Sequence, residues 1–520
     1  MTGSAGRGGI GMAIRNLEAA IWASVARRGF IGAGAAALLL AGCAAGPDFR
    51  KPDAPSVKTY APRHAPAKTV SAPVAGGAAQ RFTAGADIPG DWWTLFHSSP
   101  LNALIVNALK NNPDLAAARA ALTVARENAL AQRGEYYPSV SAEFSTSRNK
   151  QSTLLAPAPN FPAVPQEFLY SLFTPQLNIS YVPDVFGLNR RSVESLQAQA
   201  RAARFQLIAA HIALSANVVT AVVGAASLRE QVKATEQLVD IEAQSVKLLQ
   251  YQYDKGYASR LDLAAQESQL AQTQAGLPPL RKQLAQQRHL ISVLAGEFPA
   301  QAQADFDLAS LSLPQDLPLS LPSQLVEQRP DVRQARANWH AASAQVGVAI
   351  ASRLPQITLS ANAGSTALEI GNVFKSGTGF WGVGLDLAAP IFEGGKLLHA
   401  ERAAKAQLVQ AAAQYRSTVL TSFQNVADTL SALDEDAHAL KAAAAAADAA
   451  KVTLDLSQRQ WQAGYASYLS LLNAEQAWQQ ARIALIQAQA NRYADTAALY
   501  LALGGGWWRR TDLPGKDHED

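Results

Sequence analysis

The sequence predicts a mainly α-helical protein that also carries four membrane-type β-strands and consists of two copies of one structural unit. Three observations support this fold class. The two halves of the 520-residue chain repeat each other, very long segments contain no proline, and four short segments alternate apolar with polar residues. A short apolar run near the start adds an export signal in front of this fold.

The first element is an export signal over residues 1–43. Two arginines precede an apolar run from Gly29 to Leu40, which is too short for a bilayer that needs roughly 20 residues. The letters LAGC then resemble a bacterial lipobox and end at Cys43, the only cysteine of the chain. This pattern predicts cleavage before Cys43 and the covalent attachment of diacylglycerol and N-palmitate to it. Several acyl chains anchor a protein durably to a membrane.

Two details of the signal bear on the export route and the destination. The stretch ARRGFIG leaves Sec and twin-arginine export both open. Ala44, rather than an aspartate, follows the cysteine, which fits outer-membrane sorting as this class of lipoprotein implies it.

The composition after the signal argues against several classes of function. Removing residues 1–43 takes away four arginines and one glutamate, which brings the formal charge from +4 to near neutral. Nothing basic then indicates binding to nucleic acid. Since no second cysteine is available for a disulfide, packing alone must hold the fold. Residues 44–89 are rich in Ala, Pro, Gly and Thr, so we expect an extended N-terminal tether before the folded part begins.

The folded part contains an internal repeat. NPDLAAARA at 112–120 matches RPDVRQARA at 329–337, and GYAS at 256–259 recurs at 464–467. The displacement is 217 residues for the first pair and 208 for the second, so the first copy holds nine extra residues between these landmarks. We assign them to the proline-rich segment 154–166. A duplication of this size predicts that both copies share one architecture.

Each copy is expected to contain a helix opening at a proline, two strands, a very long helix, a glycine-marked turn and a returning helix. The copies occupy residues 90–322 and 323–506, and a C-terminal tail follows over 507–520. The expected elements are strands at about 138–148 and 167–182 and a long helix at about 188–250 in the first copy, and strands at about 355–364 and 379–390 and a long helix at about 396–460 in the second.

The four strands are expected to have one apolar and one polar face. On the last strand Trp381, Val383 and Leu385 alternate with glycines, and the other three alternate similarly. A half-buried soluble hairpin gives the same pattern, but the lipoprotein signal favours contact with lipid. Four strands cannot close a barrel, and open edges are not tolerated in hydrocarbon. A membrane-spanning form therefore requires several chains to share one barrel.

The two long helices repeat apolar residues every seven positions. At 1.5 Å per residue each would be on the order of 90 Å long. Two neighbouring seams run along the first of them: Val218, Ala225, Val232 and Val239, and Leu207, Leu214, Ala221 and Leu228. Two seams favour a palisade of several helices over a two-stranded coiled coil, which needs one.

Taken together, these residues resemble the TolC-type outer membrane factors, specifically the lipoprotein branch that includes OprM and NodT. The matching segments are CAAGPDFRKP at 43–52, the stretch from DWWTLF to DLAAARA at 91–120, YVPDVFG at 181–187, RPDVRQAR at 329–336 and APIFEGGK at 389–396. The resemblance implies a homotrimer with a 12-stranded outer-membrane β-barrel, continued by a long periplasmic α-helical barrel.

The resemblance also implies a function and a location. The protein would be a lipid-anchored outer membrane channel of a Gram-negative bacterium with a large periplasmic portion. It would be the passive exit duct of a tripartite, RND-type efflux system for small molecules such as drugs or toxic compounds. Its partners would be a periplasmic adaptor protein, an inner-membrane transporter and outer-membrane lipid.

Other functions remain as alternatives at this stage. They are a type I secretion duct, a metal-efflux duct, a periplasmic coiled-coil lipoprotein without a pore, and a cell-envelope enzyme. The sequence contains no HExxH motif and no Gly-x-Ser-x-Gly elbow, and its histidines are scattered. We therefore expect no enzymatic activity, no metal site and no cofactor beyond the lipid on Cys43. The sequence does not encode the cargo or the cognate transporter.

The two glycine-marked turns are the expected functional positions. As the periplasmic tip, the resemblance implies that they contact the adaptor through Gly256, Tyr257, Ala258, Ser259, Gly464, Tyr465, Ala466 and Ser467. The family often places aspartates just after the second turn, where this chain has Ser470 and Asn473. Asp262, at the position equivalent to Ser470, is the acidic candidate for the gate, although it is also a simple candidate for a helix cap.

Overall fold

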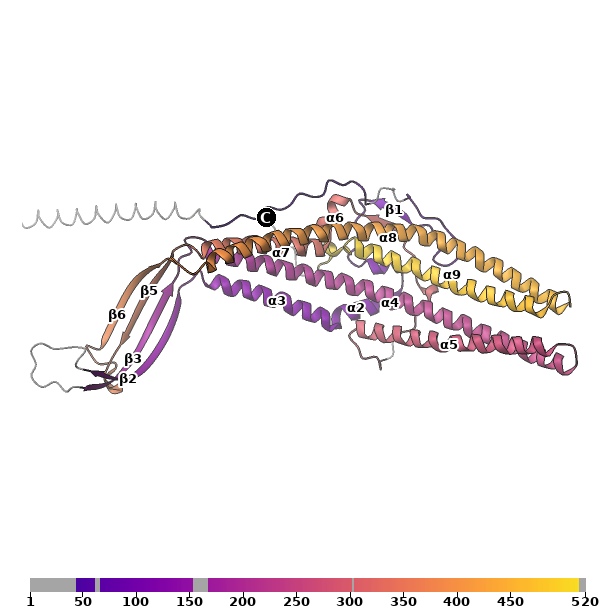
Figure 1. The fold of residues 1–520 in the computed structure, drawn as a ribbon, viewed down its shortest axis with the longest axis horizontal. Helices are drawn as coiled ribbons and strands as arrows, with labels where there is room; N and C mark the ends of the chain where they lie inside the picture. Colours follow the sequence, from indigo (N-terminus) through magenta and orange to yellow (C-terminus); the bar gives the residue numbers. More distant parts are fainter. Residues whose placement is uncertain (1–43, 61–65, 153–166, 302–303, 514–520) are drawn as a thin grey trace, which may run out of the picture. The chain divides into compact units, whose positions relative to one another are not determined.

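A computed structural model describes the chain over residues 44–60, 66–152, 167–301 and 304–513 (Figure 1). The signal with Cys43 lies outside the described residues, as does the end of the C-terminal tail from residue 514. The chain divides into two compact units, each described by itself below. We call them the strand unit (described parts of 1–50, 126–199 and 339–410) and the helical unit (described parts of 51–125, 200–338 and 411–520).

Most of the described chain is helical, and the helices confirm the duplication. The α-helices are α2 Ser99–Asn111, α3 Pro113–Gly134, α4 Leu188–Asp254, α5 Arg260–Leu294, α6 Pro322–Gln328, α7 Pro330–Ala351, α8 Lys396–Gln462 and α9 Tyr468–Ala502. Short 3₁₀ helices cover Trp92–Phe96, Leu308–Ser310, Ile370–Asn372 and Trp507–Arg509. The pairs α3 and α7, α4 and α8, and α5 and α9 have equal lengths of 22, 67 and 35 residues.

Both copies open their first long helix at the expected proline. The side chain of Asn112 accepts hydrogen bonds from the backbone N–H groups of Asp114 (3.0 Å) and Leu115 (3.1 Å), directly around Pro113 at the start of α3. Proline suits this position because the first turn leaves its N–H groups without a helical partner. Asp114 and Asp331 lie in the first turns of α3 and α7, where the helix dipole favours a negative charge.

The strand unit contains one antiparallel sheet in the order β2-β3-β5-β6 (Figure 1). Its strands are β2 Ser139–Ser152, β3 Glu167–Tyr181, β5 Gln356–Ser365 and β6 Gly379–Ala388. The assignment of the nine extra residues to segment 154–166 is wrong. The residues between the paired strands are nearly equal in number, and β2 and β3 have 14 and 15 residues against 10 each for β5 and β6. The first copy therefore has longer strands: β3 has the expected length, whereas β2 continues to Ser152 rather than ending at about residue 148, because polar residues after Phe144 obscure its end in the sequence.

The register places the apolar residues of all four strands in common rows. Val140 pairs with Ile179, Ile179 pairs with Ala361, and Ala361 pairs with Val383. Since side chains alternate between the two faces of a strand, a row of paired residues points to one face across the whole sheet. The sequence pattern of each strand thus becomes a continuous apolar face of the sheet.

The helical unit has the larger apolar core. Trp92 is fully buried and stacks on Tyr500 of α9 at 5.0 Å between ring centroids. Leu101 and Ile105 of α2 and Val219 and Val222 of α4 are also fully buried in this cluster. Each such side chain contributes about 1.5–3 kcal/mol relative to an exposed one. Six of the eight residues of the expected α4 seams are buried as well, and Leu228 and Val239 are half-buried, so the seams do pack inward.

The N-terminal segment is not a free tether over its whole length. Strand β1 (Arg81–Ala84) pairs in parallel with β4 (Asp316–Leu319), so folding begins before residue 90. Gln80 is fully buried, and its amide donates to the carbonyl of Pro314 and to Oγ1 of Thr496, each at 2.9 Å. Composition misled the prediction because backbone pairing and buried hydrogen bonds hold the segment, with Ile88, Phe82 and Tyr60 adding the few apolar contacts it makes to the core.

In the strand unit, the residues that follow Cys43 are held against the start of α4. The buried guanidinium of Arg191 donates to the carbonyl of Ala45 (3.0 Å) and to the carboxylates of Asp48 (2.6 Å) and Glu194 (2.7 Å). Phe49 stacks on His340 of α7 at 4.4 Å between ring centroids. We call this set of contacts, made by Ala45, Asp48, Phe49 and Arg191, the N-terminal clamp.

Candidate functional site

The apolar face of the β2-β3-β5-β6 sheet is uncovered by any described part of the chain. The most exposed apolar side chains lie on β6, where they alternate with glycines and Asp386: Trp381, Val383, Leu385 and Leu387. Val140, Phe144, Leu177 and Leu359 on the other strands are exposed as well. A contiguous apolar surface of this kind is unfavourable in water and is typical of contact with lipid or another protein.

The opposite face of the same sheet is polar. The carboxylate of Glu143 on β2 accepts hydrogen bonds from the side-chain amides of Gln176 (3.1 Å) and Asn178 (3.2 Å) on β3. Within the described residues, β2 and β6 each pair on one side, so the single-chain sheet has two open edges. One face suited to hydrocarbon, one suited to water and two open edges are what a segment of a membrane barrel requires.

A second apolar segment belongs to the core of the protein. Helix α4 is the one described helix that is long and apolar enough to cross a membrane, with a mean hydropathy of 1.9 over its best 18-residue window. In that window 67% of the residues are buried inside the protein. This burial identifies the window as part of the helical core.

The two expected tips have the same local structure. At each, glycine adopts a φ of +78° just after the long helix, at Gly256 after α4 and at Gly464 after α8. The next residue then donates back into the helix: Tyr257 to the carbonyl of Gln252 (2.7 Å) and Tyr465 to that of Gln460 (2.8 Å). This is the Schellman motif, and its left-handed residue is why glycine is needed.

The tips expose large side chains that such turns ordinarily cover. In a Schellman motif the residue after the glycine often packs on the last helical turn. Here Tyr257 and Tyr465 are 84% and 88% exposed, and Leu261 and Leu469, four residues later, are exposed too. Ala258 packs against the cluster beneath the tip, while Ser259 and Ser467 cap α5 and α9. Each tip therefore presents a tyrosine and a leucine to a potential partner.

The three candidate gate residues have different surroundings. Asp262 forms a capping box with Ser259, whose Oγ donates to the Asp262 carboxylate at 2.6 Å and accepts from the Asp262 N–H at 3.1 Å. The backbone N–H of Ser470 is capped by Ser467 in the same way (3.3 Å), and Asn473 is exposed on α9. Asp262 thus has a structural role at the start of α5, and its role in gating stays a prediction.

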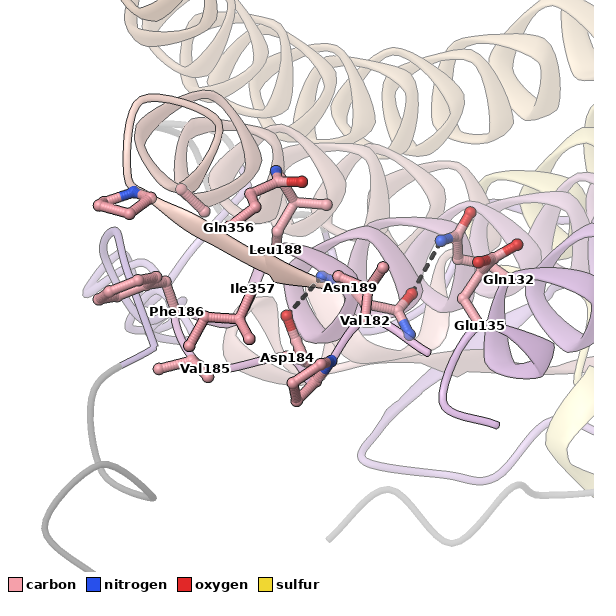
Figure 2. Close-up of a pocket in the computed structure, with 13 residues that line it drawn as sticks. Gln132, Glu135, Val182, Asp184, Val185, Phe186, Leu188, Asn189, Gln356 and Ile357 are labelled. Atoms are coloured by element: carbon pink, nitrogen blue, oxygen red, sulfur yellow. Dashed lines mark hydrogen bonds between the residues drawn. The ribbon is translucent and has the colours of Figure 1, made fainter. Parts of the chain in front are cut away.

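A cavity of about 280 Å³ lies beside the YVPDVFG segment in the strand unit (Figure 2). The carboxylate of Asp184 accepts from the backbone N–H groups of Asn189 (2.9 Å) and Arg190 (2.7 Å), and Gln132 donates to the Asn189 side chain (2.8 Å). Figure 2 shows the bonds that join Asn189 to Asp184 and to Gln132. Asp184 therefore caps α4 and is already satisfied, which explains the motif as a structural one.

The sequence did not reveal a buried polar cluster beneath the tips, which we call the carboxyl cluster. Its members come from three helices of the helical unit: Glu242 of α4, Gln266, Gln269 and Thr273 of α5, and Tyr468 and Glu475 of α9. Glu242 Oε1 accepts from Thr273 Oγ1 (3.0 Å) and Gln269 Nε2 (3.3 Å). Tyr468 donates to the side-chain oxygen of Gln266.

The two glutamates of this cluster are unusually placed. Glu242 is 0% and Glu475 4% exposed, and the Oε2 atom of each has no hydrogen-bond partner among the described residues. Burial, reinforced by the negative charge of Glu242, raises the pKa of Glu475 to about 7. Burial also raises the pKa of Glu242, although the hydrogen bonds from Thr273 and Gln269 lower it.

A signal for this cluster was present in the seam of α4. The seven-residue repeat through Leu207, Leu214, Ala221 and Leu228 continues as Thr235, Glu242 and Leu249. Two polar residues on an inward seam indicate a buried polar layer, because the positions before and after them are apolar core. Among the residues that the structure describes, no three His, Cys, Asp or Glu side chains are grouped to hold a metal ion.

An unclosed sheet with a lipid-type face, followed by paired helices of 67 and 35 residues, defines one protomer of a membrane-inserted channel. Comparisons with known proteins agree. The family described as "Outer membrane efflux protein" matches residues 104–297 and 321–505. The chain therefore belongs to the outer membrane efflux protein family, and it is an outer membrane protein.

Individual relatives resemble the chain over most of its length. The toluene efflux pump outer membrane protein TtgC of Pseudomonas putida is 30% identical over 91% of this chain and 95% of its own. The pyoverdine export outer membrane protein OpmQ of Pseudomonas aeruginosa is 29% identical over 82% of this chain and 90% of its own. The solved structure of the outer-membrane channel OprN superposes with a TM-score of 0.78 at 27% identity, over 89% of this chain and all of that one.

Proposed function

We propose that three copies of this chain form a passive exit duct of a tripartite efflux system in the outer membrane. The observation that carries the proposal is the row of apolar residues that runs in register across all four strands of an unclosed sheet. Three such sheets, joined edge to edge, supply 12 strands. The apolar faces would then contact lipid, and the Glu143 face would line a water-filled lumen.

The helices and their tips support a role for two further partners. Exposed tyrosine and leucine side chains at both tips offer apolar contacts to a periplasmic adaptor protein. The adaptor would couple the duct to an inner-membrane transporter. The duplicated tip geometry favours an adaptor that contacts both tips in the same way.

The cargo proposed is a small molecule such as a drug or a toxic compound. The named relatives serve different cargoes, toluene for TtgC and pyoverdine for OpmQ. Cargo choice would therefore belong to the transporter, and the duct would perform no bond chemistry. We also propose that the mature chain begins at Cys43 and carries diacylglycerol and N-palmitate there.

Planar-bilayer recording tests the proposal. The purified full-length protein, reconstituted in a planar lipid bilayer, should give discrete conductance steps and should migrate as a trimer when cross-linked in detergent. A water-soluble monomer without conductance would instead support a periplasmic scaffold lipoprotein. A gene for a resistance-type or metal-type transporter, next to an adaptor gene and the gene for this chain, would separate an efflux duct from a type I secretion duct.

A further inference from the structure

The carboxyl cluster joins α4, α5 and α9 next to the apolar cluster beneath the tips. The apolar cluster beneath the tips contains few buried residues: Leu249, Leu263, Leu454, Tyr468, Leu471 and Ala474. The carboxyl cluster continues from it through Tyr468 and connects α4 and α5 to α9. Gln476 of α9 adds a hydrogen bond to the side-chain oxygen of Gln269 at 2.5 Å. A small apolar core makes such polar contacts important for local stability.

No described cation compensates the two buried carboxyl groups. On α4 itself, Asp240 and Lys247 are exposed, and several charged side chains of the neighbouring helices are engaged with other partners. Lys451 of α8 pairs with Asp455 at 2.8 Å, and Arg482 of α9 donates to Gln237 at 2.9 Å. On α5, Arg260 pairs with Glu267 at 3.6 Å, and Asp262 is in its capping box. Lys451 and Arg482 also lie over the ring of Trp478, at 5.3 and 5.2 Å. Two ionised glutamates would therefore stay buried without a positive partner, which is strongly unfavourable.

Helix α5 lacks two backbone hydrogen-bond donors just beyond this cluster, although it continues as a helix to Leu294. Pro278 and Pro279 lie inside the helix, and neither can donate to a carbonyl of the preceding turn. Gly276 precedes them, and Thr273 of the carboxyl cluster lies one turn earlier. The equivalent residues of α9 are Ile486 and Gln487, so the second copy keeps both backbone donors. The segment of α5 that bonds to Glu242 can therefore move with less resistance than its twin.

We propose that Glu242 and Glu475 form a proton-binding latch that holds α9 against α4 and α5 at the tip, and that loss of the proton loosens the tip. This inference rests on the proposed function only in assigning the tip to the gate of a channel. With one carboxyl protonated, the pair carries a single negative charge and can remain buried. With both ionised, repulsion and desolvation favour separation of the helices and entry of water between them.

The sign of the pH effect follows from the folded and opened states. A carboxyl whose pKa is about 7 when buried, and ordinary when exposed, binds more protons in the latched state at intermediate pH. Latch stability is therefore full below the ordinary pKa of glutamate and is lost as the pH rises toward and through about 7. Between about pH 6 and pH 8 the loss amounts to about tenfold in the opening equilibrium.

Hydrogen exchange of the full-length protein tests the latch without reference to conductance. We expect the protection factors of residues 260–276 and 468–478, corrected for intrinsic exchange, to fall about tenfold from about pH 6 to about pH 8 in the wild type. Glu475→Gln and Glu242→Gln each keep a neutral side chain and should remove most of this fall. Glu267→Gln is the matched control, since Glu267 is exposed on α5 at the position equivalent to Glu475.

Bilayer conductance of the same variants separates the two proposals. The wild type and Glu267→Gln should conduct more at about pH 8 than at about pH 6, and Glu475→Gln should show little change. Equal pH dependence of exchange in the wild type and in both latch variants would overturn the latch. Silence of every variant at every pH, together with the expected exchange result, would overturn the channel and leave the latch standing.

Discussion

His211 of α4 is 3% exposed, and its Nε2 atom has no hydrogen-bond partner among the described residues. His211 lies seven residues before Val218 on one of the seams of α4, and its burial fits a packing role. The residue borders a cavity of about 280 Å³ that Arg119 and Asp512 also line. Burial, together with the positive charge of Arg510, lowers the pKa of His211 to about 4.

This histidine should make the protein sensitive to acid. Its folded pKa lies below the ordinary value, so the unfolded chain binds the extra proton first, and stability is lost as the pH falls from about 6.5 to about 4. His211→Gln should reduce the acid-induced loss in the free energy of unfolding by on the order of 3 kcal/mol. Chemical denaturation in detergent at about pH 7 and about pH 4 measures this difference.

The control for that experiment is His289→Gln, because His289 is exposed on α5. It should lose as much stability in acid as the wild type. If His211→Gln behaved like this control, the acid sensitivity would come from other groups.

Asp262 offers a second prediction for a single residue. The side-chain oxygen of Asn can still accept from the backbone N–H and the Oγ of Ser259, and the backbone N–H of residue 262 still donates to Ser259 Oγ, so Asp262→Asn should change the free energy of unfolding by less than about 1 kcal/mol. If Asp262 contributes to the gate, the same variant should alter single-channel conductance and reduce cation selectivity in reconstituted trimers. Ser470→Ala is the matched change at the equivalent tip. Unchanged conductance and selectivity in Asp262→Asn would leave Asp262 with its capping role alone.

The sequence revealed exposed residues at the site more readily than buried ones. Gly256 and Gly464 were predictable because a repeated glycine after a long helix has one common structural use. Glu242 and Glu475 were not, since each lies on a different copy and their proximity depends on how α9 packs against α4 and α5. Only Glu242 could be recognised in the sequence, because it is a polar residue on an apolar seam.

Among the elements, the strands and the long helices were the most predictable. Helix α8 begins at Lys396 as expected, and β6 begins at Gly379. Apolar residues recur at a regular spacing in these elements, because each element has one apolar side over many residues. The end of β2 was less predictable: we expected it at about residue 148, but the strand continues to Ser152, because polar residues such as Asn149 and Lys150 pair in the ladder just as apolar ones do. Backbone pairing, not composition, decides the length of these strands.

The apolar face of the sheet gives a prediction for a strand. Val383 is exposed on β6 and shares its row with Ala361, Ile179 and Val140. Val383→Lys would place a charge against lipid, which costs about 2–4 kcal/mol near the bilayer centre. We expect a lower yield of heat-stable oligomer in the outer membrane fraction, measured by electrophoresis of unheated samples.

Ser141→Lys provides the comparison on the polar face, because Ser141 pairs with Asn178 beside Glu143. This lysine would face the proposed lumen, and oligomer yield should stay close to that of the wild type. Equal yields from the two lysine variants would contradict the assignment of the faces.

The whole molecule is expected to have two independent attachments to the membrane, the shared barrel and the lipid on Cys43. Cys43→Ser should abolish labelling by radioactive palmitate, because no other cysteine exists in the chain. The purified variant should still conduct after reconstitution, since the strands do not depend on the lipid. Palmitate labelling that persists in Cys43→Ser would contradict the lipobox assignment.

The N-terminal clamp has a consequence for the position of the protein along the bilayer normal. Ala45 and Asp48 are fixed to Arg191 a few residues after β3 ends and α4 begins. Fatty acids on Cys43 would thus enter the inner leaflet close to where the strands leave it. A protomer held in this way could not slide up or down without pulling its own acyl chains out of hydrocarbon, so the clamp would fix the depth at which the duct sits.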